Sequence, residues 1–298
     1  MVELSVNVNK VALLRNSRGG DEPNVLAMAR IAMDHGAYGI TVHPRPDLRH
    51  IRPSDVRNLA RMLRTEYPGA EFNIEGNPFA PANEHGYPGL LALVEETRPD
   101  QCTLVPDSDE QLTSDHGFDI ARDGDRLLPL VTRLKQCSAR VALFMDAESA
   151  DAMREVRTIG ADRIELYTGP YATEVAANPT NEATSGNDIT LANESTPPNH
   201  TIPLNHTIPL NHTVYAAACV PFARAARAAT AAGLGVNAGH DLNLINLPAF
   251  AAISGLLEVS IGHALIGDAL LIGMGPAVAR YVAVLRRANL TRALDHPG

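Results

Sequence analysis

Short apolar runs alternate along the chain with longer stretches in which apolar residues recur at helical spacing. The runs with the composition of strands are Leu4–Val8, Gly39–Val42, Glu71–Ile74, Cys102–Val105, Arg140–Met145, Arg163–Leu166, Leu234–Val236 and Val259–Ile261. Helical stripes follow most of them, as in Pro23–His35, Pro53–Tyr67 and Ala147–Gly160. Strands that alternate with helices are expected to pair in parallel, because a parallel crossover needs the connecting helix.

The number of strand–helix repeats distinguishes two architectures. Eight repeats predict a single α/β domain over residues 1–298, a closed (β/α)8 TIM barrel with extra helices. An open, doubly wound parallel sheet is the alternative that the same alternation allows. The barrel is preferred because eight is the number of strands at which such a sheet closes on itself.

One interval, residues 174–213, is too long for a single connecting helix. Within it the hexapeptide Asn-His-Thr-Ile-Pro-Leu occurs at Asn199–Leu204 and again at Asn205–Leu210, and a third copy begins at Asn211. The segment is rich in Asn, Thr and Pro, which predicts a low-complexity, mobile surface loop inserted after the sixth strand. Without these roughly 40 residues the chain has about 258, a typical size for a (β/α)8 barrel.

The repeat has two other interpretations. Its three histidines at six-residue spacing could bind a metal ion, but no carboxylate or cysteine partner is fixed nearby, so no metal site is expected. Each Asn-His-Thr is also a formal glycosylation sequon, which we expect to be idle in a protein without a secretion signal.

Composition and charge disfavour several classes of protein. The 298 residues include 25 Lys+Arg and 34 Asp+Glu, which gives a formal net charge of −9, and 45% of them are hydrophobic. A general nucleic-acid binder needs a basic face, so this acidic balance disfavours nucleic acid as a partner. Three separated cysteines without a CxxC pair disfavour a disulfide framework or a thiolate zinc site and fit a reducing cytoplasm.

The apolar segments predict neither secretion nor a membrane partner. Residues Met1–Lys10 lack the basic start and the long apolar core of a secretory signal, so a cytoplasmic protein is expected. The longest apolar region, Leu242–Leu257, is short for a membrane helix and contains Asn243 and Asn246. We therefore expect a buried helix there.

Polar residues gather where the expected strands end, which is the edge that carries the active site of a (β/α)8 barrel. They are Asn7, Asn9 and Lys10 at the first strand, His43 and Arg45 at the second, Glu75 and Asn77 at the third, Asp146 at the fifth, Glu165 and Thr168 at the sixth, His240 at the seventh and His263 at the eighth. We expect these side chains to share one mouth.

His43, Glu75 and His240 are the acid/base candidates. They end three different strands at one rim, and His and Glu are residues whose pKa values can be tuned to neutrality, although a lone histidine is more often a core residue. Glu165 stands between two apolar residues, so we expect it to point into the barrel, where a carboxylate needs a partner or a proton. Asp146 precedes an expected helix, and capping that helix is its alternative role.

Two glycine-containing segments predict phosphate binding. Residues Ile261–Gly267 pass from the last strand into a helix, where glycine lets the backbone approach an anion and the helix presents free N–H groups. Residues Arg15–Gly20 contain two arginines and a glycine pair, which suit a second phosphate. An ordinary basic surface loop is the alternative for this second segment.

A series of short motifs occurs in order along the chain. They are Asn7-Val8-Asn9, Leu14-Arg15-Asn16-Ser17-Arg18-Gly19, Gly39-Ile40-Thr41-Val42-His43-Pro44-Arg45, Arg49-His50-Ile51, Asn73-Ile74-Glu75, Leu104-Val105-Pro106, Thr168-Gly169-Pro170-Tyr171-Ala172, Val236-Asn237-Ala238-Gly239-His240 and Ile261-Gly262-His263-Ala264. Together they resemble the pyridoxine 5′-phosphate synthase family, the ring-closing enzymes of vitamin B6 synthesis. The resemblance runs from about Glu3 to the last expected helix and skips only the long loop.

The resemblance implies a transferase-class enzyme, assembled as a homo-octamer, that condenses 1-deoxy-D-xylulose 5-phosphate with 3-amino-2-oxopropyl phosphate. The products would be pyridoxine 5′-phosphate, inorganic phosphate and water, and no metal or organic cofactor is implied. Acid/base catalysis would fall to His43, Glu75 and His240, and stabilisation of transition-state charge to Glu165. The residues implied to hold the aminooxopropyl phosphate are Asn7, Arg18, Gly262 and His263, and those implied to hold the deoxyxylulose phosphate are Arg45, His50 and Thr113.

The chain departs from the commoner pattern of the family at two places that are expected to contact the substrates. Asn9-Lys10 stands where many relatives carry Asp-His, and Asp241 follows His240 where glycine is usual. The carboxylate of Asp241 is an unusual neighbour for a phosphate ester. The long loop at 174–213 also falls where it would lie near the substrates.

Two other functions fit the same residues. A different phosphosugar enzyme, such as an isomerase, epimerase or aldolase, would share the phosphate site and process one phosphorylated sugar alone. A non-catalytic binder of phosphate ligands is disfavoured by the intact set of His43, Glu75 and His240. A Schiff base on Lys10 is disfavoured as well, because one implied substrate already supplies the amine.

Overall fold

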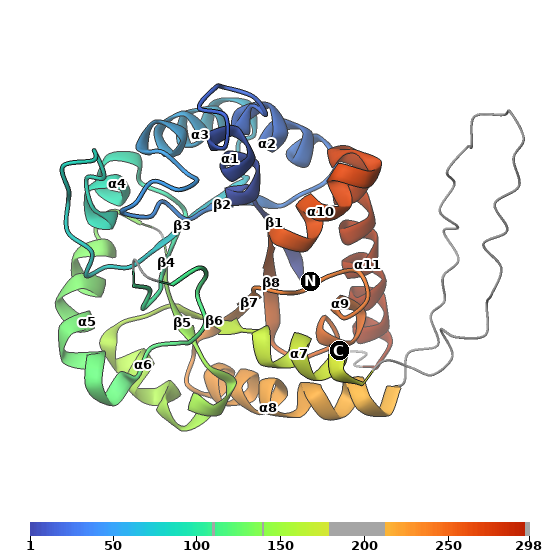
Figure 1. Ribbon diagram of the computed structural model, residues 1–298. Coiled ribbons are helices and arrows are strands. Elements are labelled where there is room, and N and C mark those ends of the chain that lie inside the picture. The colour runs from blue at the N-terminus through green and yellow to red at the C-terminus, as the bar shows by residue number, and fades with distance from the viewer. Residues whose placement is uncertain (109–110, 139, 179–211, 296–298) are drawn as a thin grey trace, which may run out of the picture.

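The strands form a closed barrel in the computed structural model, which describes residues 1–108, 111–138, 140–178 and 212–295 (Figure 1). They are β1 (Glu3–Asn7), β2 (Gly39–Val42), β3 (Glu71–Gly76), β4 (Gln101–Leu104), β5 (Arg140–Met145), β6 (Arg163–Tyr167), β7 (Gly235–Gly239) and β8 (Leu256–Ile261). Each strand pairs in parallel with the next, and β8 pairs with β1 in the register Ser260↔Ser5. The predicted barrel is confirmed, and the open sheet is excluded.

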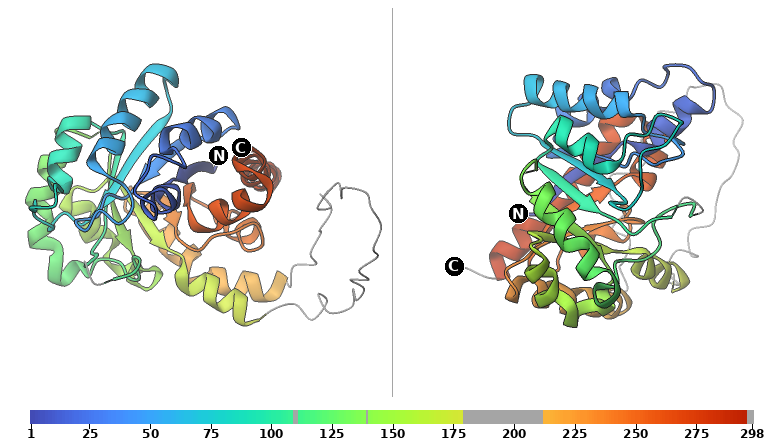
Figure 2. Two further views of the ribbon diagram at one scale, coloured as in Figure 1. Left: turned by 45° about the horizontal axis from the view of Figure 1, so that its top comes forward. Right: turned by 90° about the vertical axis from the view of Figure 1, so that its left-hand side faces the viewer.

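Helices cover the outside of the barrel (Figure 2). They are α1 (Asn9–Asn16), α2 (Val25–Asp34), α3 (Pro53–Glu66), α4 (Leu90–Thr97), α5 (Ile120–Leu134), the 3₁₀ helix η1 (Ala147–Ala152), α6 (Met153–Ile159), α7 (Gly169–Ala177), α8 (His212–Ala231), α9 (Leu247–Phe250), α10 (His263–Ile272) and α11 (Met274–Asp295). More than one helix follows β1, β5, β6 and β8, which confirms the expected extra helices.

The barrel wall alternates between apolar and polar side chains. On β1, Leu4 and Val6 are buried in the apolar core, whereas the hydroxyl of Ser5 lies 2.7 Å from that of Thr41 on β2. Successive side chains of a strand point to opposite faces. The apolar residues of β1 therefore pack against the helices and its polar residues point into the barrel, whereas the inward positions of β5 are the apolar Ala142 and Phe144.

Buried charges occupy the amino-terminal end of that interior. Arg140 of β5 pairs with Glu71 of β3, and Arg163 of β6 pairs with Glu258 of β8 at 2.9 Å. Burial, reinforced by the neighbouring Glu71, raises the pKa of Glu258 well above its ordinary value. The protonated form of Glu258 is therefore favoured, which lets two carboxyl groups lie together with two arginines.

The buried helix expected at Leu242–Leu257 is wrong. Only α9 is helical there, and β8 already begins at Leu256. The side chain of Asn243 accepts hydrogen bonds from the backbone N–H groups of Ile245 and Asn246. Such local bonds offer the backbone an alternative to a helix, so the apolar composition of the segment misled the prediction. No helix in the described parts of the chain is long and apolar enough to cross a membrane.

The long insertion expected at 174–213 lies mostly outside the described residues, which stop at 178 and resume at 212. Its first residues belong to the end of α7, and its last belong to the start of α8. The first two copies of the hexapeptide and the sequon interpretation lie outside the described residues, as does the proposed trio of histidines except for His212.

Candidate active site

His43 lies just beyond β2 and contacts groups from three other strand ends. Its backbone N–H donates to Asn9 Oδ1 at 2.8 Å. Its ring Nδ1 lies 3.7 Å from Glu75 Oε2, and its Nε2 lies 3.2 Å from Asp107 Oδ2. The side chains of His43, Glu75 and Asp107 are each at most 10% exposed. Burial lowers the pKa of His43 to about 4, so its ring is neutral at neutral pH.

Glu75 occupies the inward position of β3 that follows Asn73. It lies 3.5 Å from Asn7 Nδ2 and 3.5 Å from Ser260 Oγ, both on neighbouring inward positions. Burial is the largest influence on its carboxyl and raises its pKa to about 8. At neutral pH a protonated carboxylic acid therefore faces the neutral ring of His43, which provides a proton donor beside a proton acceptor.

This buried acid gives a pH-dependent prediction for stability. Because the pKa of Glu75 is higher in the folded chain than its ordinary 4.5, its effect on stability is favourable at low pH and is lost as pH rises toward 8. Glu75→Gln has no such loss. The variant should gain unfolding free energy over the native chain between about pH 4.5 and 8, by up to about 5 kcal/mol at 1.36 kcal/mol per pKa unit. Urea unfolding at several pH values measures this, and a pH-independent difference would contradict it.

Glu165 points into the barrel from β6, as predicted, and its side chain is buried. Burial, followed by the charge of Glu75, raises its pKa well above the ordinary value, and a hydrogen bond with Thr103 opposes this rise. Gly239 on β7 makes room for it, because a Cβ atom there would lie 2.2 Å from Glu165 Oε1. A protonated Glu165 can donate a hydrogen bond to an oxygen that gains charge.

His240 sits at the mouth, directly after β7, with a side chain 21% exposed. Its φ of 82° is unusual for a residue with a side chain, and Thr168 fixes this turn by donating to the carbonyls of Gly239 and His240 at 2.8 and 2.7 Å. Its Nε2 lies 2.7 Å from Thr113 Oγ1, and its ring packs edge-on against Tyr167. Burial is the largest influence on both neighbours, and it raises the pKa of Glu75 and lowers that of His43. A positive charge on His240 opposes the first shift and adds to the second, so these three residues influence one another.

The carboxylate of Asp241 has a partner in the ring of His240. Its Oδ2 lies 3.1 Å from His240 Nδ1, and this contact is the largest of several that lower its pKa. Asp241 therefore contacts the ring of His240 at the nitrogen opposite to the one that contacts Thr113.

The segment after β8 has the form expected of a phosphate site. Gly262 precedes α10, whose first residue is the exposed His263. A Cβ atom on Gly262 would approach Asn7 to 3.1 Å, which is closer than most Cβ contacts, so any other residue here would require Asn7 to shift by a few tenths of an ångström. Arg18 lies exposed just beyond α1, a helix that contacts α10. No hydrogen bond or ion pair within the described ranges joins Arg18 to Gly262 or His263.

Arg45 and His50 lie beside His43 and are buried. The guanidinium of Arg45 pairs with Asp107 and donates to Gln111 O at 2.7 Å. His50 Nδ1 accepts from the backbone N–H of Ile51 at 3.0 Å, which leaves Nε2–H as a donor. Burial is the main cause that lowers the pKa of His50 to about 2, with a smaller contribution from the charge of Lys10. His50 is therefore a neutral hydrogen-bond donor.

Arg15 does not offer its guanidinium to a phosphate, contrary to the expectation for Arg15–Gly20. It is buried and binds both carboxylate oxygens of Asp55, at 2.6 and 2.9 Å. It also donates to His50 O at 3.2 Å, and Asn16 donates to the same carbonyl at 2.7 Å. The motif thus positions the turn that carries His50.

Asp146 and Asp107 both follow strand ends, but within the described residues only Asp107 contacts His43. Asp146 makes no side-chain bond to its own helix, and its Oδ1 accepts from the backbone N–H of Gly117 at 3.0 Å. Asp107, which was missed in the sequence, contacts both His43 and Arg45. It follows β4 by three residues, so its position at a strand end was the signal that could have found it.

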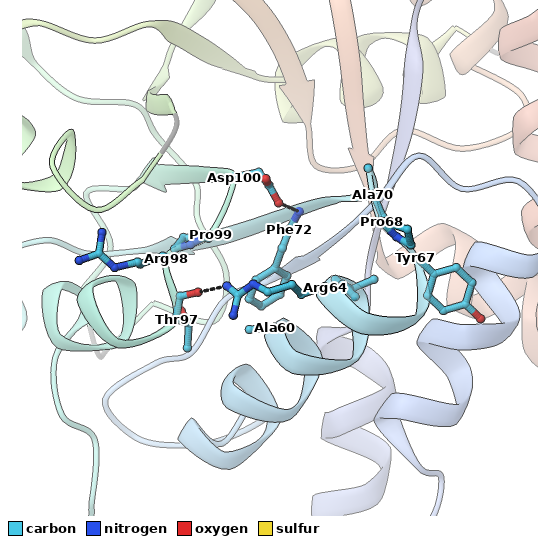
Figure 3. Close-up of a pocket in the computed structure, with 12 residues that line it drawn as sticks. Ala60, Arg64, Tyr67, Pro68, Ala70, Phe72, Thr97, Arg98, Pro99 and Asp100 are labelled. Carbon is cyan, nitrogen blue, oxygen red and sulfur yellow. Dashed lines mark hydrogen bonds between the residues drawn. The ribbon is translucent and has the colours of Figure 1, made fainter.

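A cavity of about 280 Å³ lies at the opposite end of the barrel (Figure 3). It is bordered by α3, by the end of α4 and by the residues where β3 and β4 begin, including Arg64, Phe72 and Asp100. Arg64 donates to Thr97 O across it at 2.8 Å. None of the residues that line this cavity belongs to the His43 cluster, so the two are separate. Nor do the described residues contain a group of three or more His, Cys, Asp and Glu side chains that could hold a metal ion.

Comparison with solved structures agrees with the barrel. The chain superimposes on thiamine phosphate pyrophosphorylase from Pyrococcus furiosus with a TM-score of 0.52 at 11% identity, covering 96% of each chain. A tryptophan synthase α-subunit from the same organism gives a TM-score of 0.54 at 11% identity, over 95% of this chain and 96% of the other. At such identities the likeness establishes the fold alone.

Comparison with curated protein sequences is far more specific. The chain is 50% identical over 290 residues to pyridoxine 5′-phosphate synthase of Xanthomonas axonopodis pv. citri, covering 97% of this chain and 98% of the relative. It is 48% identical over 287 residues to the protein of the same name from Xylella fastidiosa, covering 96% and 95%. Residues 4–287 match the model of a family described as pyridoxal phosphate biosynthesis protein PdxJ, so it is to the PdxJ family that this chain belongs.

Proposed function

We propose that the chain is a pyridoxine 5′-phosphate synthase, which condenses 1-deoxy-D-xylulose 5-phosphate with 3-amino-2-oxopropyl phosphate to pyridoxine 5′-phosphate, phosphate and water. Relatives about 50% identical over nearly their whole length bear this name. The observation that carries the proposal at the level of the site is the protonated Glu75 beside the neutral His43. The reaction transfers a substrate fragment, so we assign it to the transferases.

The proposed chemistry needs proton transfer at every stage and no redox step. Imine formation, dehydration, phosphate elimination and aromatisation each add or remove protons. Glu75 supplies a proton and His43 accepts one without either group having to ionise first. His240, at the mouth, exchanges protons closer to solvent, and Glu165 donates a hydrogen bond to developing negative charge from inside the barrel.

Two groups of residues would hold the substrates. Asn7, Arg18, Gly262 and His263 frame the site before α10, which we assign to the aminooxopropyl phosphate. Across the mouth, the deoxyxylulose phosphate would contact the residues Asn9, Lys10, Arg45, His50 and Thr113, with Asp241 supporting His240. Both Arg45 and His50 are buried, so contact with that substrate would require the groups that cover them to move.

The cellular setting follows the family as well. We propose a homo-octamer in the cytoplasm whose ligands are the two phosphorylated substrates, with no nucleic-acid or membrane partner. The chain acts as one barrel domain, with 174–213 as its inserted loop.

Incubation of the purified chain with both substrates tests the function. We expect fluorescence of pyridoxine 5′-phosphate and one inorganic phosphate for each product molecule. Omitting either substrate should abolish the signal. Conversion of one phosphorylated sugar without the amine would instead identify an isomerase, epimerase or aldolase. Binding of either phosphate ester without any turnover would identify a non-catalytic binder.

A further inference from the structure

Asp107 lies in the loop after β4, and both its carboxylate and its backbone carbonyl contact other residues. Its Oδ2 lies 3.2 Å from His43 Nε2 and also pairs with the guanidinium of Arg45. Its backbone carbonyl accepts from Asn77 Nδ2 at 2.5 Å, and its side chain hydrogen-bonds to Ser114. Only 7% of the residue is exposed. Because this buried carboxylate lies beside the ring of a proposed catalytic residue, it can influence the protonation of that ring.

The charge of Asp107 is maintained by these contacts. Burial alone would raise the pKa of its carboxyl, but the contacts with His43 and Arg45 outweigh burial and hold the pKa below its ordinary value. The carboxyl is therefore ionised at neutral pH and can only accept hydrogen bonds.

The charge of Asp107 favours one of the two possible positions for the proton of the His43 ring. The neutral ring carries one N–H, and the carboxylate, whose Oδ2 lies 3.2 Å from Nε2, attracts that proton to Nε2 through its charge. Nδ1 then presents its lone pair, and the atom that it faces is Glu75 Oε2 at 3.7 Å. The other tautomer would set an N–H against the protonated Glu75 and leave Asp107 facing a lone pair.

We propose that Asp107 is a positioning residue that fixes His43 as the Nε2–H tautomer and stabilises the imidazolium that forms when Nδ1 takes up a proton. The inference rests on the proposed function for its catalytic consequence. In the step itself a bond between hydrogen and an atom of the substrate breaks as the N–H bond at Nδ1 forms, and the electron pair of the broken bond stays on the substrate. In a later dehydration the proton leaves Nδ1 for the departing hydroxyl, which becomes water, and His43 is neutral again.

Because Asp107 also holds Arg45, its two effects must be separated. Loss of a purely structural contact with Arg45 would weaken binding of the deoxyxylulose phosphate and raise its KM. Loss of control over His43 would instead lower kcat, since proton transfer is impaired once both substrates are bound. The ratio of the two changes therefore distinguishes the two roles.

The test compares Asp107→Asn with Asp107→Glu and with Asp115→Asn. Asp115 carries the same charge nearby in the chain and is exposed, and within the described residues its side chain pairs with the exposed His116 and with Gln111. We expect Asp107→Asn to lower kcat by about 10²–10⁴-fold, the range that a positioned proton transfer contributes. Asp107→Glu keeps the carboxylate and should recover at least part of that loss, while Asp115→Asn should match the native kcat.

A second readout needs no substrate. In protein labelled with ¹⁵N-histidine, NMR distinguishes the two ring nitrogens and shows which one carries the proton. The signal of His43, assigned by its absence in His43→Gln, should report the Nε2–H tautomer in the native chain and in Asp107→Glu. In Asp107→Asn it should shift toward a mixture or toward Nδ1–H.

The outcomes separate this inference from the function itself. If the native chain forms no product but His43 is the Nε2–H tautomer and changes in Asp107→Asn, the proposed function fails and the positioning role stands. A native tautomer in a folded Asp107→Asn variant, or a higher KM with unchanged kcat, would overturn the role on His43. If Asp107→Asn does not fold, the same measurements on Asp107→Glu decide, because its displaced carboxylate should still alter kcat and leave the Nε2–H tautomer in place.

Discussion

Glu75→Gln should lower kcat by about 10²–10⁴-fold while the KM of each substrate changes far less. Glutamine preserves the size of the side chain and its hydrogen bonds to Asn7 and Ser260, but it cannot release a proton. The native carboxyl is protonated below pH 8, so the substitution leaves the charge of the resting site unchanged and removes only its ability to transfer a proton. Steady-state kinetics at neutral pH measures both constants.

The pH profile supplies the control for this prediction. In the native chain kcat/KM should fall above about pH 8, where Glu75 loses the proton that it must donate. It should also fall as pH drops toward 4, where the ring of His43 becomes charged. The residual activity of Glu75→Gln should lack the alkaline fall. A nearly native kcat in this variant would remove Glu75 from the proposed acid/base role.

Asp55→Asn should lower the free energy of unfolding by about 3–5 kcal/mol, the usual effect of leaving one partner of a buried ion pair without the other. The Arg15 and Asp55 side chains are 5% and 8% exposed and bind through two parallel contacts. Asp55 also accepts from the backbone N–H of Arg52 at the start of α3. The charge of Arg15 would stay buried without its partner, so the midpoint of urea unfolding should fall.

A matched surface pair provides the comparison for this effect. Arg30 and Glu66 make a similar two-contact ion pair, but their side chains are 42% and 41% exposed. Glu66→Gln should leave the unfolding midpoint almost unchanged, because solvent screens exposed pairs. Equal effects of the two substitutions would show that burial does not govern the contribution of the Arg15–Asp55 pair.

The barrel and much of its mouth could be predicted because the alternation of side chains along a strand indicates both the face that packs against the helices and the face that points inward. Apolar residues such as Val6 and Ile74 mark the face toward the helices, and the residues between them must then point inward. The same alternation predicted that Glu165 points into the interior, whereas Glu75 was predicted from its place at the end of a strand. Their roles in catalysis remain predictions that the variants above can test.

Contacts between segments far apart in the chain could not be predicted in this way. Arg15 looked like a phosphate ligand because nothing in its own segment shows that Asp55, 40 residues later, binds it. Asp107 was missed for the related reason that its partners His43 and Arg45 lie more than 60 residues earlier. At Leu242–Leu257, side-chain bonds made by Asn243 outweighed apolar composition.

The protonated carboxyls inside the barrel change how an acidic protein can attract anions. Counting residues gives −9, but this count treats Glu75, Glu165 and Glu258 as ionised, whereas the pKa of each is raised toward or beyond neutrality. The native chain is therefore up to three charges less negative than its composition suggests. Two phosphate esters entering the mouth would meet correspondingly weaker repulsion from the interior beneath them.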